Sequence, residues 1–310
     1  MRLSRPMVWA CATAAGFWGA LLSVIFASRP GFWGDFLAWW YGAGVLLRGG
    51  NPYVDLPKAA PWFISEPLFY PLTAIVAAVP VAPLPYRFAL GVFFGVAAAT
   101  LGYVVATRRP HLFPLFFSFP FLMAAQFGHW SPFLLAAAIV PALGFFAAVK
   151  PNVGIALAVA RPSREMVIGC AVLVAISLVV LPRWPLDWLA NMRTAPRHPT
   201  PMFTWLGAPL LLSVLRWRRP EARLLLAMAL IPQTASFADQ LVLFAIPSTR
   251  KESMILALCS LVGGLAWVMA VRNSTELPVL IGAPYLIAGM YLPALVLVLR
   301  RPNVTEAESS

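Results

Sequence analysis

The chain consists almost entirely of long apolar runs that short polar loops separate. A membrane-spanning helix needs about 20 predominantly apolar residues, and fewer where neighbouring elements cover its ends. About twelve runs approach this length; they cover residues 7–27, 67–83, 88–106, 112–127, 131–147, 151–161, 166–182, 204–215, 222–236, 238–248, 253–271 and 278–299. The runs 151–161, 204–215 and 238–248 are too short to cross alone, which predicts broken, re-entrant or tilted helices there.

Composition narrows the fold class further. Hydrophobic residues make up 61% of the chain and charged residues 11%, whereas soluble domains carry about 45–50% apolar and about 25% charged residues. A soluble core of this composition would leave large apolar patches in water. The sequence therefore predicts an all-α, polytopic transmembrane helical bundle of about 10–12 spans. We expect this multi-pass protein in a bacterial plasma membrane, in contact with membrane lipids.

The net charge of +12 lies in short clusters between the apolar runs. Clusters of this kind bias the orientation of membrane loops, so nucleic acid is not expected as a partner. With the N-terminus inside and the spans alternating, the inner loops are Arg87, 160–165, 216–223, 248–252 and 300–303. The outer segments are then 28–66, 107–111, the surroundings of Lys150, 183–203 and 272–277.

Several cations fall on the outer side, against the positive-inside rule. They are Arg108, Arg109, Lys150, Arg183, Arg193 and Arg197. Two explanations stay open: the topology differs in the middle of the chain, or outer cations are needed there to bind an anion.

The domain organisation is simple. Arg2 and Arg5 precede an apolar run that is longer than the 7–15 residues of a signal-peptide core, so we interpret 7–27 as the first transmembrane helix. Residues 1–300 form one transmembrane domain in this interpretation, and 301–310 form a short disordered tail. The three cysteines have no metal-ligand spacing.

Acidic residues are scarce, with eleven in the chain. Those on the predicted outer side are Asp35, Asp55, Glu66, Asp187, Asp239 and Glu276. Asp35 begins an aromatic-rich stretch that can form a helix along the membrane surface and would end at Gly49-Gly50. Two roles for Asp35 stay open: a helix N-cap, or a base presented at the membrane interface.

Four stretches together resemble a known family. They are GDFLAWWYGAGVLLRGGNPY (34–53), FYPLTAIVAAVPVAPLP (69–85), AAQFGHWSPFLLAA (124–137) with AAVKPNVGIALAVA (147–160), and ASFADQLVLFAIP (235–247). The chain resembles the GT-C superfamily of polytopic glycosyltransferases, and within it glycosyltransferase family 87, the polyprenyl-phosphate-mannose-dependent group. Members often have Tyr-Pro-Pro where this chain has Tyr70-Pro71-Leu72, and Gly-Gln where it has Gly128-His129.

The resemblance implies a donor sugar, mannose in that family, on a polyprenyl phosphate, and transfer at the outer face to a lipid or glycan acceptor. An Asp in the first outer loop is taken as the base in the superfamily, and Asp35 matches that position. The departing phosphate needs positive charge, for which Lys150, Arg108, Arg109, Arg193 and Arg197 are candidates. An isolated Lys between apolar runs is costly unless paired, which favours Lys150, although a snorkelling Lys at a helix end would fit the same pattern.

Other candidate binding residues are Glu66, Tyr70, His129 and Asp239. Asp239 lies in a short apolar segment, and a carboxylate at membrane depth is a functional-site hypothesis by default. His129-Trp130 marks another break, where the Trp is either a platform for a sugar ring or an interfacial anchor.

Cofactors are not expected, because neither a phosphate-binding glycine loop nor a cluster of metal ligands is visible. A divalent metal held loosely by an acid and the substrate stays open. Two other functions also stay open: a transporter or flippase of lipid-linked saccharides, and an inactive GT-C-like scaffold subunit.

Overall fold

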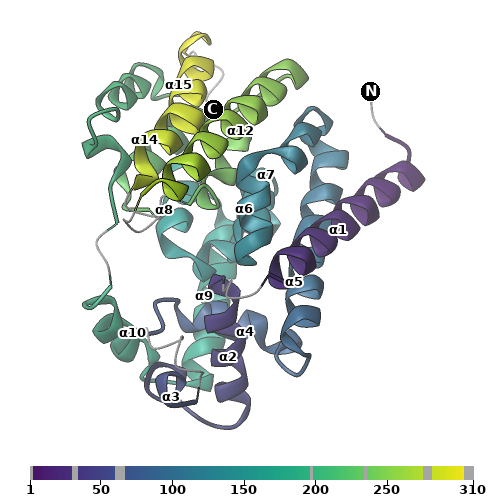
Figure 1. Cartoon of the computed structure of the whole chain (residues 1–310), viewed down its shortest axis with the longest axis vertical. Helices are drawn as coiled ribbons and strands as arrows, with labels where there is room; N and C mark the ends of the chain where they lie inside the picture. The colour runs from purple at the N-terminus through teal and green to yellow at the C-terminus, as the bar shows by residue number, and fades with distance from the viewer. Residues whose placement is uncertain are drawn as a thin grey trace.

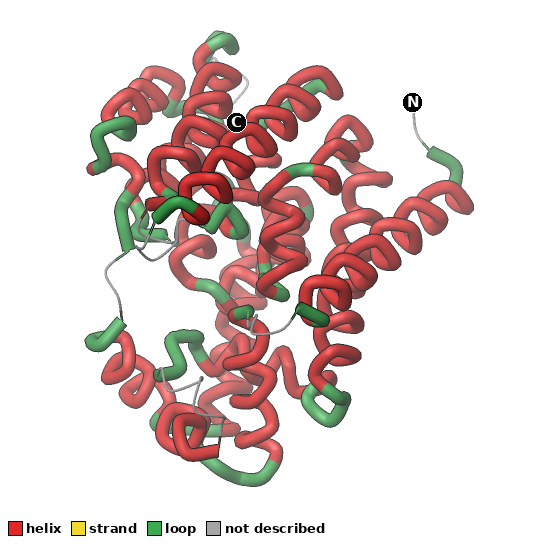
Figure 2. Tube along the Cα trace, viewed as in Figure 1, coloured by secondary structure: helices red, strands yellow, loops and turns green. Residues whose placement is uncertain are grey.

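The computed structural model describes residues 3–29, 34–59, 67–195, 198–233, 236–274 and 281–303. The regular elements in this part of the chain are all helices joined by loops and turns, and it contains no strand (Figure 2). The predicted all-α class is therefore confirmed.

Long helices form the frame of the molecule. Within the described ranges, three helices are long and apolar enough to cross a membrane: α1 (Arg5–Ala27), α5 (Tyr86–Arg108) and α12 (Arg250–Arg272). The pair α9 (Arg164–Val180) and α10 (Trp184–Met192) adds a fourth candidate if this pair, bent by 100°, is one span. These helices are consistent with a membrane protein, and they are fewer than the predicted 10–12 spans.

The remaining elements are short. They are α2 (Asp35–Leu47), α3 (Pro52–Ala59), α4 (Leu72–Ala78), η1 (Val79–Val81), η2 (Pro110–Phe117), α6 (Phe119–Phe127), α7 (Ser131–Ile139), η3 (Pro141–Val149), α8 (Pro151–Ala160), η4 (Pro201–Phe203), η5 (Ala208–Arg216), α11 (Pro220–Leu230), η6 (Asp239–Ala245), α14 (Ala283–Leu286), the π-helical η7 (Ile287–Tyr291) and α15 (Leu292–Leu299). The predicted helix after Asp35 is confirmed as α2, which ends beside Gly49 in the left-handed conformation (φ 78°).

Small residues allow α1 and α5 to pack closely in opposite directions. A Cβ at Gly102 would lie 2.7 Å from the Cβ of Ala15, and one at Gly16 would lie 2.9 Å from that of Ala99. Small residues of this kind let membrane helices approach at backbone distance. At 1.5 Å per residue the 23 residues of α5 span about 34 Å, so its two ends lie on opposite sides of the molecule.

Four of the five predicted inner loops, 160–165, 216–223, 248–252 and 300–303, gather at one end, which we call the basic end. Arg216 Nε donates to the Arg301 carbonyl (2.6 Å), and Arg223 Nη2 donates to that of Ala160 (2.9 Å). Arg301 Nη1 donates to the carbonyl of Ile246 (2.9 Å). In Figure 1 this end, with α15, is at the top, and the opposite α2 end, with α2, α3 and α10, is at the bottom.

The segment 67–83 does not cross the molecule, which corrects the predicted topology. Its helix α4 has seven residues and passes into the three-residue η1, because the prolines of VPVAPLP cannot continue a helix. Tyr86, just beyond it, packs on Phe36 and Trp40 of α2 (ring centroids 5.9 and 5.6 Å). The chain therefore enters α5 from the α2 end.

This correction reverses which side of the molecule each end of α5 occupies. Arg87 lies at the α2 end rather than with the inner loops. Arg109 Nη1 donates to the Ala245 carbonyl (2.8 Å), and His111 Nε2 lies 3.0 Å from that of Pro247. The segment 107–111 therefore belongs to the basic end. The predicted topology had placed Arg108 and Arg109 on the outer side, against the positive-inside rule, and the corrected position agrees with that rule.

Three breaks in the chain replace several predicted full spans. The breaks fall at His129, between α6 and α7, at Lys150, between η3 and α8, and just before Asp239, between α11 and η6. The predicted span 131–147 is in fact α7 followed by η3, with a reversal at Val140-Pro141. A nine-residue α-helix is about 14 Å long, half of a hydrocarbon core of about 30 Å. These breaks therefore lie inside the molecule, where the site forms.

The corrected topology predicts on which side of the membrane cysteines introduced at chosen surface positions become labelled. We expect Arg48→Cys and Arg87→Cys, in a chain without its native cysteines, to react with an impermeant maleimide from the same side of oriented vesicles. Arg108→Cys should react only from the opposite side. All three positions are exposed. Labelling of residues 48 and 108 from one side would contradict this fold.

Candidate functional site

Side chains from five separate segments meet in one polar cluster, which we call the central cluster: Asp35, Tyr70, His129, Lys150 and Asp239. Tyr70 Oη donates to Asp35 Oδ2 (2.7 Å), and His129 Nε2 lies 4.0 Å from the same oxygen. Lys150 Nζ lies 2.6 Å from His129 Nε2 and 2.8 Å from Asp239 Oδ1. Of the residues predicted for the site, the structure brings these five together.

Asp35 is the first residue of α2, but it does not cap the helix. The N-cap is Gly34, whose backbone passes so close to Phe127 that a Cβ there would lie 2.7 Å from the Phe127 Cα. The Asp35 carboxylate instead accepts the Tyr70 hydrogen bond, and its side chain is 46% exposed. It is thus held by one partner and open on its other side.

The segment that carries Tyr70 is fixed from the α2 end. Tyr53 Oη donates to the Tyr70 carbonyl (3.0 Å), and Trp188 Nε1 of α10 donates to that of Phe69 (2.9 Å). Burial, and then the charge of Asp187, raise the pKa of Tyr53 well above its usual value. Tyr53 therefore remains a donor at all working pH values.

The Asn51-Pro52-Tyr53 motif shapes this loop. Asn51 Oδ1 accepts from the Tyr53 amide (3.0 Å), and Asn51 Nδ2 donates to Asp187 Oδ2 (2.8 Å). The Asn51 amide donates to Asp55 Oδ2 (2.7 Å). Two of the candidate outer acids, Asp55 and Asp187, therefore hold the loop together rather than join the central cluster.

His129 connects the three breaks through a chain of hydrogen bonds. Lys150 Nζ lies 2.6 Å from His129 Nε2, while Ser131 contacts the other ring nitrogen: its Oγ lies 2.5 Å from Nδ1 and its backbone N–H donates to Nδ1 (3.2 Å). Ser131 Oγ in turn donates to the carbonyl of Ala238 (2.6 Å), next to Asp239. The imidazole ring therefore links Lys150 to Ser131 and Ala238.

Lys150 and Asp239 form a buried ion pair. Their side chains are 11% and 2% exposed. The contact is close, but the hydrogen-bond alignment at Asp239 Oδ1 is poor, and His129 Nε2 lies 3.5 Å from the same oxygen. Buried charges of opposite sign are tolerated when paired. Each of these two residues therefore compensates the buried charge of the other.

Sequence reasoning missed Ser131 and His198. His198 lies in the half-buried segment before η4. Burial lowers its pKa and so does the charge of Lys150, whereas Asp239 and Asp35 raise it. It therefore stands within electrostatic range of the central cluster. The only signal in the sequence was a His among outer prolines.

Aromatic rings form the wall behind Tyr70. Trp39 stacks on Trp130 (centroids 4.7 Å apart) and also contacts Tyr70 (5.7 Å). Both tryptophans are fully buried, so Trp130 is neither an interfacial anchor nor an open platform. It packs the wall that sets the position of Tyr70.

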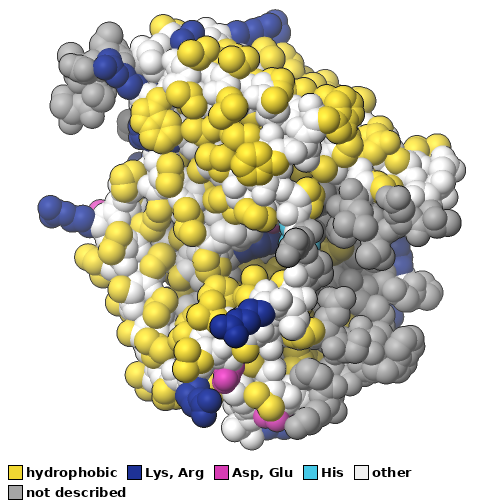
Figure 3. Space-filling view, turned by 90° about the vertical axis from the view of Figure 1, so that its left-hand side faces the viewer, with side chains coloured by type: hydrophobic (Ala, Val, Ile, Leu, Met, Phe, Trp, Pro, Cys, Tyr) yellow, Lys and Arg dark blue, Asp and Glu magenta, His cyan; other side chains and the backbone are white. Residues whose placement is uncertain are grey.

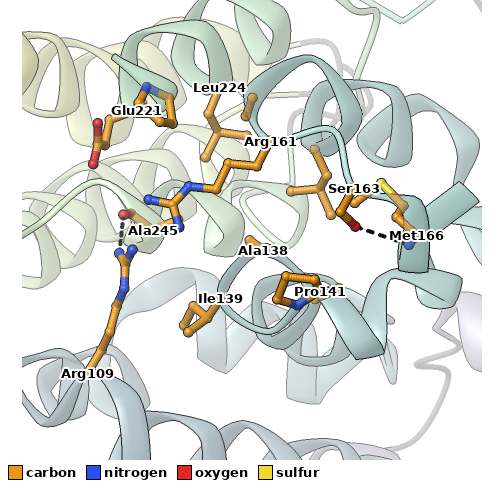
Figure 4. Close-up of a pocket in the computed structure, with 14 residues that line it drawn as sticks. Arg109, Ala138, Ile139, Pro141, Arg161, Ser163, Met166, Glu221, Leu224 and Ala245 are labelled. Atoms are coloured by element: carbon orange, nitrogen blue, oxygen red, sulfur yellow. Dashed lines mark hydrogen bonds between the residues drawn. The ribbon is translucent and has the colours of Figure 1, made fainter. Parts of the chain in front are cut away.

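Other predicted residues lie elsewhere. Arg108 and Arg109 are at the basic end, where the Arg109 side chain points to Ala245 (Figure 4). Arg193, at the end of α10, is exposed. Glu66 and Arg197 fall outside the described residues. Within the ranges that the structure covers, no three His, Cys, Asp or Glu side chains are grouped to hold a metal ion.

The central cluster combines two chemical capacities. A half-exposed carboxylate can accept a proton, and a Lys beside it can bind an anion. Figure 3 shows hydrophobic side chains over much of one face, Lys and Arg at its upper edge, and a hollow near the middle in which Lys or Arg and His atoms are visible.

No protein-family model, curated protein or solved structure matches this chain. Fold and site alone therefore define its class: a protein whose described residues form only helices, three or four of them apolar and long enough to span a membrane, around a central carboxylate–lysine cluster.

Removing one member of the buried ion pair should be costly. We expect Asp239→Ala to lower the free energy of unfolding by about 3–5 kcal/mol, because it leaves the Lys150 charge without its carboxylate. The double variant Asp239→Ala/Lys150→Met should be more stable than Asp239→Ala alone. Denaturant unfolding of both proteins in detergent measures this, and strictly additive losses would contradict the pairing.

Proposed function

We propose that the protein is an integral membrane glycosyltransferase with a GT-C-like fold. It transfers a sugar, mannose in our proposal, from polyprenyl phosphate to a lipid or glycan acceptor at the α2 end, which would face the outside of a bacterial plasma membrane. The observation that carries the proposal is the half-exposed Asp35, held by Tyr70, with its Oδ2 4.0 Å from His129 Nε2, which in turn lies 2.6 Å from Nζ of the buried Lys150.

Asp35 is the base in this mechanism. Its free oxygen removes the proton of the acceptor hydroxyl as that oxygen attacks C1 of the sugar. The bond from C1 to the phosphate oxygen breaks on the opposite side, so the configuration at C1 inverts. The hydrogen bond from Tyr70 Oη leaves one carboxylate oxygen positioned and the other available.

Lys150 balances the charge of the leaving group. The polyprenyl phosphate gains negative charge as the bond to C1 breaks, and a fixed cation stabilises this charge in a dry site. Asp239 holds Lys150 in place before the donor binds. His129 Nε2, 2.6 Å from Lys150 Nζ, also fixes its position.

Asp35→Asn tests the base directly. The amide oxygen can still accept from Tyr70, so we expect the variant to fold and express normally while transfer falls at least about 10²-fold, the lower range for loss of a general base. Membranes supplied with radiolabelled polyprenyl-phosphate mannose provide the measurement, as label in lipid and glycan fractions. Full transfer by this variant would end the mechanism.

The same assay separates the two other functions. A transporter would move the labelled lipid across vesicles without breaking its bond to the sugar, whether or not residue 35 is acidic. A scaffold subunit would show no turnover, and its loss would reduce the abundance of another protein.

Substitution of Lys150 should act on the donor phosphate. We expect Lys150→Met to reduce kcat/KM at least about tenfold, the effect of one charge-assisted contact of about 1.5–3 kcal/mol. Arg48→Met, which removes an exposed cation from the α2 end, should leave kcat/KM unchanged. Equal losses in the two variants would indicate a general charge effect and contradict a specific role of Lys150.

A further inference from the structure

A second polar pocket lies at the basic end, apart from the central cluster. Its wall is formed by the ends of several short elements, among them α7, α8, η6 and the first turn of α11 (Figure 4). The cavity has a volume of about 50 Å³. A water molecule needs about 10–15 Å³ on this scale, so the cavity has room for a group the size of a few water molecules.

Two guanidinium groups and one carboxylate line this pocket. Arg109 Nη1 donates to the Ala245 carbonyl, and Arg161 extends into the space between Ala245 and Leu224 (Figure 4). Among the described residues the side chain of Arg161, which is an exposed residue, has no hydrogen-bond or ion-pair partner. Glu221 Oε2 is buried and lacks a described hydrogen-bond partner. A buried polar atom such as Glu221 Oε2 is normally satisfied by a bound molecule when the protein does not satisfy it.

Charge favours an anion in the pocket. Burial lowers the pKa of Arg109, and the neighbouring charges of Arg161 and Arg301 lower it further, while Glu221 opposes them. The two guanidinium groups that line the cavity exceed its single carboxylate by one positive charge. One monoanionic group would neutralise this excess, and a planar guanidinium matches phosphate oxygens in bidentate fashion.

Apolar surface continues from the pocket toward the outside of the bundle. Leu157, Leu224 and Pro141 form the apolar part of its wall. Ser163, at its rim, also lines an open apolar groove with Val167 and Ile168 of α9, and both of these side chains are more than 60% exposed. A ligand that follows both surfaces has a polar anionic head and an apolar chain.

We propose that this pocket binds the head group of a membrane phospholipid. The phosphodiester lies between Arg109 and Arg161. A hydrogen-bond donor of the head group, the ammonium of ethanolamine or a hydroxyl of glycerol, contacts Glu221 Oε2. An acyl chain follows the groove along Val167 and Ile168. Choline has no such donor, so phosphatidylcholine should bind more weakly.

Native mass spectrometry of the full chain, delipidated in detergent, tests this proposal. We expect phosphatidylethanolamine or phosphatidylglycerol to bind at least tenfold more tightly than phosphatidylcholine of the same chain length. Arg161→Ala should weaken the binding of all three lipids, because all three carry the phosphodiester. Arg250→Ala is the matched control, because Arg250 is an exposed arginine of the basic end that does not line the pocket, and it should retain the wild-type affinities.

A second variant distinguishes loss of lipid binding from misfolding. Glu221→Gln keeps the shape of the side chain, and we expect it to reduce the preference for phosphatidylethanolamine over phosphatidylcholine while the midpoint of thermal unfolding changes little. Equal binding of the three lipids, or unchanged lipid affinities in Arg161→Ala, would overturn the proposal. If inorganic phosphate stabilises the wild type as much as the lipids do, and Arg161→Ala abolishes that effect, the ligand is a soluble phosphate and the lipid assignment is wrong.

Discussion

The ion pair between Lys150 and Asp239 is the interaction on which the centre of this protein depends. Each residue stands at a break between two short elements, where a helix would otherwise continue. Neither charge would be stable alone at 11% and 2% exposure. Paired, they join the η3–α8 turn to the start of η6, and the His129–Ser131 chain joins the α6–α7 turn to both.

The breaks also expose backbone groups that would be expensive in an apolar interior. Side chains satisfy several of them. Ser131 donates to the carbonyl of Ala238, Thr73 Oγ1 to that of Ala148 (2.6 Å), and Arg109 to that of Ala245. Polar residues that are isolated in the sequence therefore satisfy backbone groups of the fold. The central cluster is both the proposed reaction site and a set of contacts that hold the short elements together.

The same short elements build both proposed sites. α7 and α8 begin beside the central cluster, at Ser131 and Pro151, and they end at the pocket of the basic end, near Ile139 and Ala160. Within the central cluster, solvent exposure falls from the half-exposed Asp35 to the buried Asp239. A reacting hydroxyl would meet the exposed side, while the buried side holds the charge that a leaving phosphate requires.

Sequence alone determined the all-helical class, the helix after Asp35, the break at His129 and the short segment that contains Asp239; it placed Lys150 in an outer loop rather than at a break inside the molecule. Apolar run length and helix-ending glycines are local properties, so they are readable without a structure. The segment 67–83 was misjudged because its apolar length is that of a span, and only packing against α2 shows that it turns back at its prolines. That one error placed Arg108 and Arg109 beside Asp35.

The tertiary structure alone decided which polar residues meet. Asp35, Tyr70, His129, Lys150 and Asp239 are separated by up to 204 positions, from 35 to 239, and no periodicity relates them. Ser131 gave no signal and His198 only a weak one, because a single hydroxyl or imidazole acquires its role from its neighbours. The sequence supplied the polar groups and the points where helices break; the physical requirement that buried charges be paired brought them together.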